Sequence, residues 1–264
     1  MFLSSTGMVE LSITKTDNTD GFDAKTCREL FEIEDRHFWH VGRKRIILDA
    51  LRRNVPRLAK IRMLEIGCGN GNVMAYLRQN GIDVEGGDLS VDGLEYCRQR
   101  MGDVPLHRIG ILSLPFHNEF DIIGAFDVLE HVKNDERALT EVKWALKPKG
   151  SIVLTVPAHK FLWSYFDEEA GHKRRYSKSE ITTKLERAGF TVKRISFFMF
   201  FLLPILSLVR ITHRHSKAPE SKVVPVINDI FLALLTVERW LMRYMNLPTG
   251  SSLLVIAEKR GETP

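Results

Sequence analysis

Residues 63–73, MLEIGCGNGNV, constrain the fold of this chain more than any other part of its sequence. Gly67, Gly69 and Gly71 stand at alternate positions directly after a short apolar run that contains one acid, Glu65. In an open parallel sheet, ligands bind beyond the carboxyl ends of the strands, and a strand-to-helix turn without Cβ atoms lets backbone N–H groups approach them closely. The glycines therefore predict a ligand-binding turn after the first strand of such a sheet.

The alternation of patterns after residue 61 predicts the sheet to which this turn belongs. Apolar strand-like runs such as FDIIGAFDVL and SIVLTVP alternate with helical patterns such as NVMAYLRQNG. This rhythm is typical of βαβ units, so we expect an α/β fold with a doubly wound, mostly parallel sheet and helices on both faces. Two later strand-like runs, Thr191–Phe198 and Ser251–Glu258, complete the expected sheet.

Composition divides the chain into segments. Residues 1–22 are rich in Ser, Thr, Asp and Asn without periodicity, and we expect a disordered tail there. Residues 23–57 predict an N-terminal helical cap with a break near Gly42. We expect the main domain at residues 58–260, with a hydrophobic helical insertion at residues 199–249.

Charge and cysteine content exclude some function classes. The 264 residues carry a net charge of +5 from 38 basic and 33 acidic side chains, which is too mild and mixed for a nucleic-acid footprint. Cys27, Cys68 and Cys97 lack CxxC or metal-ligand spacing, so we expect free thiols, a reducing compartment and no bound metal. The first residues lack the basic and apolar regions of a signal peptide, and we expect a cytoplasmic protein.

The glycine spacing and the acid before it indicate which ligand the turn suits. The dinucleotide fingerprint is GxGxxG, whereas this chain has GxGxG with Asn72 where the third glycine would stand. A carboxylate at Glu65 would repel phosphates near the turn but would attract a cationic ligand. These residues favour a positively charged, nucleoside-like cofactor, with a nicotinamide-dependent oxidoreductase as the alternative.

Several motifs in order carry a family resemblance between residues 61 and 157. They are LEIGCGNG, VEGGDLS, LSLPF, FDIIGAFDVLEHV and LKPKGSIVLTVP. With them the chain resembles the class I S-adenosylmethionine-dependent methyltransferases of the methyltransferase-11/12 type, which include the ubiquinone-pathway O-methyltransferases. The resemblance implies a seven-stranded Rossmann-like sheet and S-adenosylmethionine as cofactor. It also implies in-line methyl transfer, favouring oxygen, to a small-molecule or lipid- or glycan-linked acceptor.

The resemblance also assigns cofactor-binding residues. Asp88, at the end of the second strand, would accept hydrogen bonds from the ribose hydroxyls, and Arg43 would reach the methionine carboxylate. Gly110 stands where the family often has an adenine-binding acid, so adenine recognition would fall to the backbone near Ile111 and Leu112 and to Phe126. The remaining members of this predicted set are Glu65, Gly67, Cys68, Gly69, Gly71 and Leu89. The alternatives are a helix N-terminal acid at Asp88, a surface basic helix around Arg43 and an ordinary core residue at Phe126.

Two histidines are candidates for the catalytic base that a hydroxyl acceptor needs. His131 lies in VLEHV after the expected fourth strand, with Glu130 beside it as an orienting acid. His172 lies in GHKRRY, which resembles a pattern in a bacterial methyltransferase subgroup linked to glycan or lipid biosynthesis. In the same motif we predict that Arg174, Arg175 and Tyr176 bind substrate, since guanidinium groups suit phosphate or carboxylate. The alternatives are loop-packing roles and a solvated charged face.

The insertion carries two hydrophobic elements. Ile195–Val209 has no charge, but Pro204 interrupts it and a membrane-spanning helix needs ~20 apolar residues, so we expect no crossing. A second helix is predicted over Asn228–Met245, with Asn228 as its N-cap. We favour a roof over the substrate site. The alternative is peripheral contact of residues 195–245 with the inner face of the membrane, aided by basic residues between the helices, Arg210, His213, Arg214, His215 and Lys217. A non-catalytic membrane-surface binding module is the second alternative to an enzyme.

Overall fold

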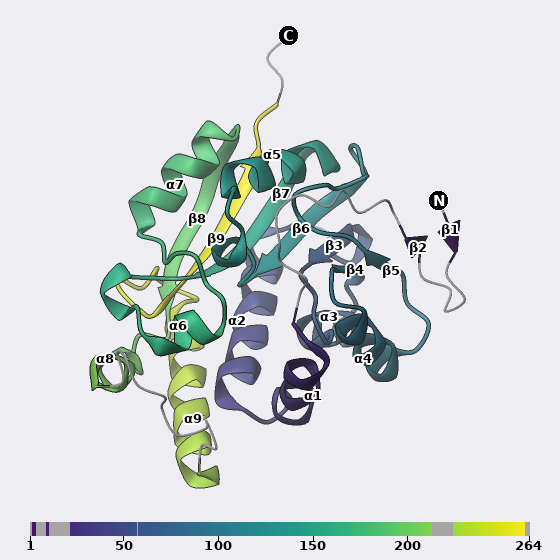
Figure 1. Cartoon of the computed structure of the whole chain (residues 1–264). Helices are drawn as coiled ribbons and strands as arrows, with labels where there is room; N and C mark the ends of the chain where they lie inside the picture. The colour runs from purple at the N-terminus through teal and green to yellow at the C-terminus, as the bar shows by residue number, and fades with distance from the viewer. Residues whose placement is uncertain (1, 4–8, 11–21, 57, 213–223, 262–264) are drawn as a thin grey trace.

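The computed structural model describes residues 2–3, 9–10, 22–56, 58–212 and 224–261. Within these residues one sheet has the strand order β1-β2-β5-β4-β3-β6-β7-β9-β8 (Figure 1). Its longer strands are β3 (Arg62–Ile66), β4 (Asp83–Asp88), β5 (Leu106–Arg108), β6 (Phe120–Phe126), β7 (Leu146–Pro157), β8 (Phe190–Phe198) and β9 (Ser252–Lys259). Two-residue strands, β1 (Phe2–Leu3) and β2 (Val9–Glu10), extend the β5 edge, and the rest of the predicted tail up to residue 21 lies outside the described residues.

The strand directions confirm the doubly wound, mostly parallel sheet of seven main strands. Strands β5, β4, β3, β6 and β7 are parallel neighbours, and β9 lies antiparallel between β7 and β8. The helices are α1 (Ala24–Ile33), α2 (Phe38–Asn54), α3 (Asn72–Gln79), α4 (Val91–Met101), α5 (Asp135–Ala145), α6 (Tyr165–Glu169), α7 (Lys178–Arg187), α8 (Leu203–Thr212) and α9 (Pro225–Leu241). The segment LSLPF forms a turn after β5.

The core follows from the burial of the central strands on both faces. Such strands form nearly continuous apolar runs, and β6 and β9 expose almost none of their side chains. Because the parallel strands share one direction, the carboxyl ends of β3, β4, β6 and β7 meet at one edge of the sheet. The glycine turn, Asp88 and His131 follow these ends, so the fold gathers the predicted site residues at that edge.

The sequence predicted a break in the helical cap near Gly42, and this prediction is wrong. Helix α1 ends at Ile33, and α2 runs from Phe38 through Gly42 without interruption. A Cβ atom on Gly42 would lie 2.5 Å from Cδ1 of Leu235 in α9. The glycine therefore permits close packing of α2 against α9. The break in the cap lies between Ile33 and Phe38 instead, where His37 is the N-cap of α2.

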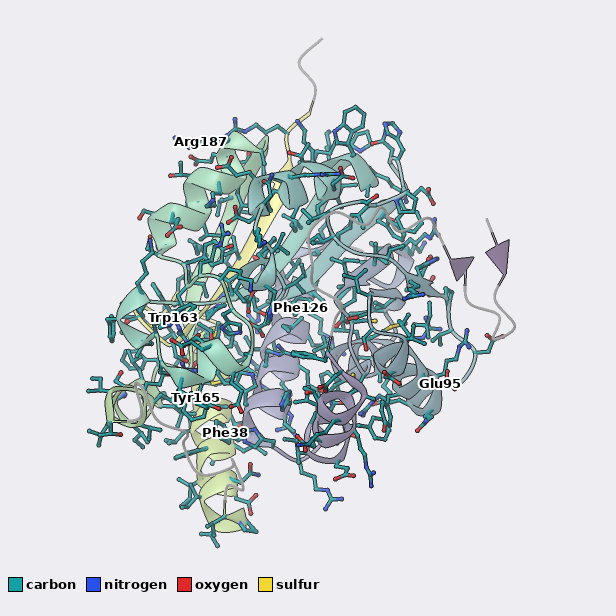
Figure 2. All side chains as sticks on the ribbon, in the orientation of Figure 1. Phe38, Glu95, Phe126, Trp163, Tyr165 and Arg187 are labelled. Atoms are coloured by element: carbon teal, nitrogen blue, oxygen red, sulfur yellow. The ribbon has the colours of Figure 1, made fainter. Side chains whose placement is uncertain are left out.

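Asn228 is also not the N-cap of its own helix. Helix α9 begins earlier, at Pro225, whose fixed φ suits the first helical turn. The Oδ1 of Asn228 instead accepts the backbone N–H of Phe38 at 2.8 Å, and its Nδ2 donates to the carbonyl of Arg36 at 3.0 Å. The Phe38 ring, labelled where α2 begins in Figure 2, packs edge-on against Phe231 with ring centroids 5.0 Å apart. The insertion thus caps and covers the start of α2.

A buried acid in α9 attaches this helix to the segment that follows β8. Glu238 in α9 is fully buried, and its carboxylate accepts the backbone N–H groups of Met199, Phe200 and Phe201 at 2.5, 2.8 and 3.3 Å. These three residues lead from β8 toward α8. Three backbone donors compensate for much of the cost of burying a carboxylate. The insertion therefore has a defined attachment at each end of α9.

Candidate active site

The glycine turn after β3 combines two packing glycines with one open position. All three glycines have positive φ, 73° at Gly67, 50° at Gly69 and 73° at Gly71. A Cβ atom would lie 2.4 Å from Val128 at Gly67 and 2.5 Å from Cys97 at Gly71, whereas at Gly69 it would meet open space. Gly69 therefore has free space on the side where a Cβ atom would stand, next to the end of the strand. The thiol of Cys68 is buried in the core, so only its backbone faces the turn.

Asp88 joins the end of β4 to this turn. Its Oδ2 accepts the N–H of Gly69 at 2.7 Å, and its Oδ1 accepts the N–H of Ser90 at 2.8 Å. Desolvation raises the pKa of Asp88, and these backbone hydrogen bonds oppose that effect. The carboxylate is held at the turn and does not point away into solvent. It thus lies where a ligand bound against Gly69 would meet it.

The side chain of Leu89 packs against Gly110. A Cβ atom on Gly110 would lie 3.2 Å from Cδ2 of Leu89, which follows Asp88. Leu89 thus occupies the space that a side chain at position 110 would need. The structure places Ile111 and Leu112 in the turn beyond, with Ile111 buried in the core and Leu112 packed against it.

Phe126 lies in the core at the end of β6 (Figure 2). Only 4% of its surface is exposed, and a Cβ atom on Gly124 would lie 2.8 Å from its ring. The ring therefore folds back over the strand. This arrangement agrees with the alternative reading of the sequence, in which Phe126 is an ordinary core residue.

Glu65 and Arg43 each keep one buried polar atom that has no hydrogen-bond partner among the described residues. These atoms are Oε2 of Glu65 and Nε of Arg43. Burial raises the pKa of Glu65 to about 8, and the charge of Arg43 opposes this rise. Arg43 also forms an ion pair with Asp127, which follows β6. An α-amino-acid group would satisfy both orphaned atoms, its ammonium at Glu65 and its carboxylate at Arg43.

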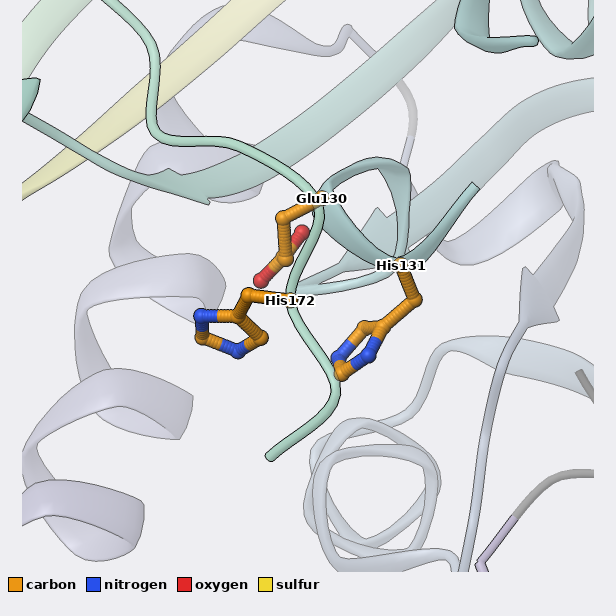
Figure 3. Close-up of side chains that lie close together, drawn as sticks. All are labelled: Glu130, His131 and His172. Carbon is orange, nitrogen blue, oxygen red and sulfur yellow. The ribbon is translucent and has the colours of Figure 1, made fainter. Parts of the chain in front are cut away.

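The two predicted catalytic histidines lie together (Figure 3). His131 ends a 3₁₀ turn, Leu129–His131, and His172 lies on the loop after α6, with ring centroids 4.8 Å apart. The N–H of Lys173 donates to the carbonyl of Glu130 at 2.7 Å and joins the two loops. Burial lowers the pKa of His131 to about 4, and His172 adds to this effect. His131 is therefore neutral near pH 7 and can accept a proton, and its lowered pKa also makes it a weak base.

Asp167 orients His172. Its Oδ1 lies 2.8 Å from Nδ1 of His172, so the second ring nitrogen, Nε2, is left for other partners. Hydrogen bonds and the positive charge of Arg175 and Arg210 lower the pKa of Asp167 to about 2 despite its burial. Sequence reasoning missed Asp167 as a functional residue, because only its position against His172 reveals the role.

The remaining GHKRRY residues have internal partners. Arg175 is 2% exposed and pairs with Asp167 at 2.8 Å, and the hydroxyl of the fully buried Tyr176 donates to Asp135 at 2.8 Å. Arg174 also pairs with Asp135, at 2.9 Å. The substrate-binding role predicted for Arg175 and Tyr176 is therefore not supported, because their polar groups are buried and engaged. Side chains of the motif thus attach the loop to two buried carboxylates, those of Asp167 and Asp135.

Glu130 does not orient His131 as the sequence suggested. It is fully buried, and neither of its carboxylate oxygens has a hydrogen-bond partner among the described residues. Burial and the nearby Asp127 carboxylate raise the pKa of Glu130 well above its usual range. Sequence reasoning also missed Phe22, whose ring lies edge-on to His131 with centroids 6.1 Å apart, and whose carbonyl accepts the hydroxyl of Ser90 at 2.9 Å. The segment before α1 therefore spans the two halves of the site.

Comparison with known sequences decides the family. A methyltransferase domain family matches residues 38–195, which is more than half of the chain. The chain belongs to this methyltransferase family. The match confirms the class I S-adenosylmethionine-dependent methyltransferase resemblance, and S-adenosylmethionine is the cofactor of that class. The subgroup that GHKRRY resembles stays a prediction.

Curated relatives match part of the methyltransferase. A malonyl-[acyl-carrier protein] O-methyltransferase from Enterobacter lignolyticus (strain SCF1) is 27% identical over 157 residues, 56% of this chain and 62% of the relative. A ubiquinone biosynthesis O-methyltransferase from Dechloromonas aromatica (strain RCB) is 30% identical over 104 residues, 37% of this chain and 45% of the relative. The chain thus spans less than two thirds of the length of either relative.

A solved structure shares the whole architecture. The methyltransferase complex with the Trm112 activator from Haloferax volcanii has a TM-score of 0.60 and 18% identity, and the match covers 91% of this chain and 96% of that one. At this identity the likeness concerns the fold. It supports the doubly wound sheet and the position of its carboxyl edge.

Proposed function

We propose that the chain transfers a methyl group from S-adenosylmethionine to an oxygen atom of a small-molecule or lipid-linked acceptor. One observation carries the proposal: Glu65 and Arg43, whose charges interact, each keep a buried polar atom without a hydrogen-bond partner among the described residues. This set matches a cofactor whose amino-acid end carries both charges and whose sulfonium is cationic. Glu65, Arg43 and Gly69 would hold the methionine end, and Asp88 the ribose. When bound, the cofactor supplies an electrophilic methyl group.

The histidine pair suits an oxygen acceptor. A hydroxyl is a poor nucleophile until its proton is removed, and a positioned base contributes typically 10²–10⁴-fold. His131 is neutral near pH 7, and His172 has Nδ1 held by Asp167, so each can offer a ring nitrogen to the acceptor proton. Alignment of acceptor and methyl group supplies as much as ~7–11 kcal/mol in well-oriented cases. The O-methyltransferase names of the curated relatives agree with this choice of atom.

The surface of the insertion favours a lipid-linked acceptor. Helix α8 buries none of its described side chains, and α9 buries only Leu235 and Glu238. Large apolar side chains are exposed instead, on α8 at Ile205, Leu208 and Ile211, and on α9 at Val226, Ile230, Val237 and Trp240. Contiguous exposed apolar side chains mark interaction sites. In Figure 1 α9 extends away from the sheet.

We infer that this surface contacts a bilayer that carries the acceptor. No helix in the described ranges has the length and hydropathy to cross a membrane. The sequence that follows α8, HRHSK, is basic, and basic residues beside apolar helices favour anionic lipid surfaces. Arg210 is an exception to the predicted basic set, because it turns inward to Asp167 at 2.7 Å, and His213–Lys217 lie outside the described residues.

The reaction is tested with isotopically labelled methyl donor. The purified chain is incubated with labelled S-adenosylmethionine and either membrane-lipid or aqueous extracts, and the labelled product is identified by mass spectrometry. We expect an O-methylated product in the lipid fraction. Label in the aqueous fraction alone would remove the lipid-linked acceptor, and labelled nitrogen would overturn the choice of atom. No label in either fraction contradicts methyl transfer.

Membrane contact is tested by flotation with anionic vesicles. Leu208→Glu combined with Ile211→Glu should abolish flotation of the chain, because both side chains are more than 60% exposed on α8. Trp144→Glu is the matched control, since Trp144 is 58% exposed on α5, outside the insertion. Equal loss of flotation in both variants, or none in either, contradicts a contact through α8.

A further inference from the structure

We propose that Glu130, His131 and His172 bind one divalent first-row metal cation. The three side chains converge at the carboxyl end of β6 (Figure 3), and each offers a ligand atom within 4.8 Å of the other two. Glu130 and His131 come from the turn after β6, and His172 comes from the loop after α6. Forty-one positions separate His131 from His172, so no local spacing in the sequence signals such a site.

The state of Glu130 is the first argument for a cation. Its side chain is 0% exposed, and among the described residues neither carboxylate oxygen accepts a hydrogen bond. Buried polar groups are otherwise nearly always paired, and an unpaired buried carboxylate is costly. Glu130 lies against His131 and His172. A cation between them would satisfy both oxygens.

The orientation of His172 is the second argument. Its Nδ1 lies 2.8 Å from Oδ1 of Asp167 and donates to this carboxylate, so Nε2 is the ring nitrogen left to face a cation. A carboxylate that accepts from one imidazole nitrogen while the other binds metal is the usual outer-shell arrangement of metal sites. Asp167 is itself fixed by Arg175 and Arg210 at 2.8 and 2.7 Å. The ring is therefore oriented before any ligand arrives.

Ligand chemistry and spacing define the class of metal. Two imidazole nitrogens and one carboxylate oxygen suit Zn²⁺, Mn²⁺, Fe²⁺ or Co²⁺ better than Ca²⁺ or Mg²⁺, which prefer oxygen ligands. Metal bonds of ~2.0–2.2 Å keep ligand atoms roughly 3–3.5 Å apart. The ligand atoms, which lie up to 4.8 Å apart, therefore have to approach one another when a cation binds.

A cation here would activate the acceptor directly. With three protein ligands it keeps an open position, and an acceptor hydroxyl bound there loses its proton more readily to water. A histidine that binds metal through Nε2 is not also the proton acceptor, so in the metal-bound chain the cation would take over the role that the proposed function gives to the histidine base. This chemical role rests on the proposed methyl transfer, whereas metal binding itself does not.

The test measures metal binding without turnover. The full chain is prepared with His213→Ala and His215→Ala, because the sequence HRH at 213–215 offers a second pair of imidazoles. After treatment with chelator it is titrated separately with Zn²⁺, Mn²⁺ and Co²⁺ by calorimetry, and the visible absorption of the Co²⁺ form is recorded. We expect one cation per chain. Glu130→Gln, His131→Ala and His172→Ala should each weaken binding by at least ~10-fold.

A matched histidine provides the control. His159 stacks on Phe197 and lies 3.0 Å from Thr249 Oγ1, away from the cluster, so His159→Ala should bind metal like the parent chain. Circular dichroism checks that each variant is folded. Absence of stoichiometric binding for all three metals, or equal affinity in the cluster and control variants, overturns the site. If the chain binds metal but transfers no methyl group, the metal site stands and the proposed function is refuted. If the chain transfers methyl groups but binds no metal, the proposed function stands and the metal site is refuted.

Discussion

Arg210 donates to the carboxylate of Asp167 at 2.7 Å, and through it the hydrophobic insertion contacts the residue that orients His172. Arg210 lies on α8 and also donates to the carbonyl of Leu162 and the hydroxyl of Ser164, at 3.2 and 3.1 Å. The exposed apolar helix and the histidine loop therefore share one buried carboxylate. A displacement of α8 would change the partners of Asp167.

We predict that Arg210→Met lowers kcat by about 10-fold while cofactor affinity stays unchanged. The variant removes one charged hydrogen-bond donor from Asp167, a loss of ~1.5–3 kcal/mol in local interaction, and loosens His172. Steady-state kinetics and calorimetry with S-adenosylhomocysteine separate the two effects. Arg239→Met is the control, because Arg239 on α9 pairs with Asp49 on α2 and not with Asp167. Unchanged kcat in Arg210→Met contradicts the coupling.

We predict that cofactor binding at Glu65 is coupled to the release of a proton. Its pKa is raised from 4.5 to about 8 by burial, so the ligand-free side chain is protonated near pH 7. A cationic ammonium favours the ionised form, so binding should release up to one proton between pH 5 and 8. Calorimetry in buffers of different ionisation enthalpy measures this release. Glu65→Gln should abolish it, and a parent chain without buffer dependence would contradict the assignment.

The same group affects stability with a defined sign. A carboxyl group whose pKa is raised in the folded state, here from 4.5 to about 8, binds more protons folded than unfolded. Its contribution to the free energy of unfolding is therefore full below pH 4.5 and is lost as pH rises through about 8. Urea titrations of the ligand-free chain across this range should give a flatter pH profile for Glu65→Gln. An identical profile would mean that Glu65 titrates normally.

Asp88→Ala should weaken cofactor binding by ~1.5–3 kcal/mol, about 10- to 150-fold, by leaving ribose hydroxyls unpaired. The variant also frees the N–H of Gly69, which Asp88 accepts at 2.7 Å, so the fold is checked by its melting temperature. Asp92→Ala is the control, since Asp92 is an exposed acid in the first turn of α4. Equal affinity of parent and Asp88→Ala would exclude the ribose role.

Gly42→Ala tests the contact between α2 and α9. In an isolated helix alanine is more favourable than glycine by ~1 kcal/mol, but a Cβ atom here would lie 2.5 Å from Leu235. We expect a net loss of ~1–3 kcal/mol from overpacking. In a Leu235→Ala background the same change should be neutral or stabilising. Urea unfolding of the four chains gives the coupling, and a stabilising Gly42→Ala in the parent chain would refute the close contact.

Local sequence determined the sheet, the glycine turn and most helix positions. Strand and helix periods, and the glycines that need positive φ, depend on residues a few positions apart, so they are readable in order along the chain. The motif series around Gly67 and Asp88 predicted the glycine turn after β3 and the acid at the end of β4, which the structure joins by the hydrogen bond from Gly69 to Asp88. Family motifs extended this prediction to Arg43, whose positive charge opposes the raised pKa of Glu65, and its role in cofactor binding stays a prediction.

Only the tertiary structure decided the roles of residues whose partners are distant in sequence. Gly42 resembled a helix break and Asn228 a local N-cap, yet their partners lie on the opposite helix, with 190 positions between Asn228 and Phe38. Arg175 resembled a substrate ligand until the fold buried it against Asp167. The cluster of Glu130, His131 and His172 likewise exists only because two loops meet at the carboxyl edge of the sheet. Side-chain pairing across loops depends on the assembled core, and no local pattern encodes it.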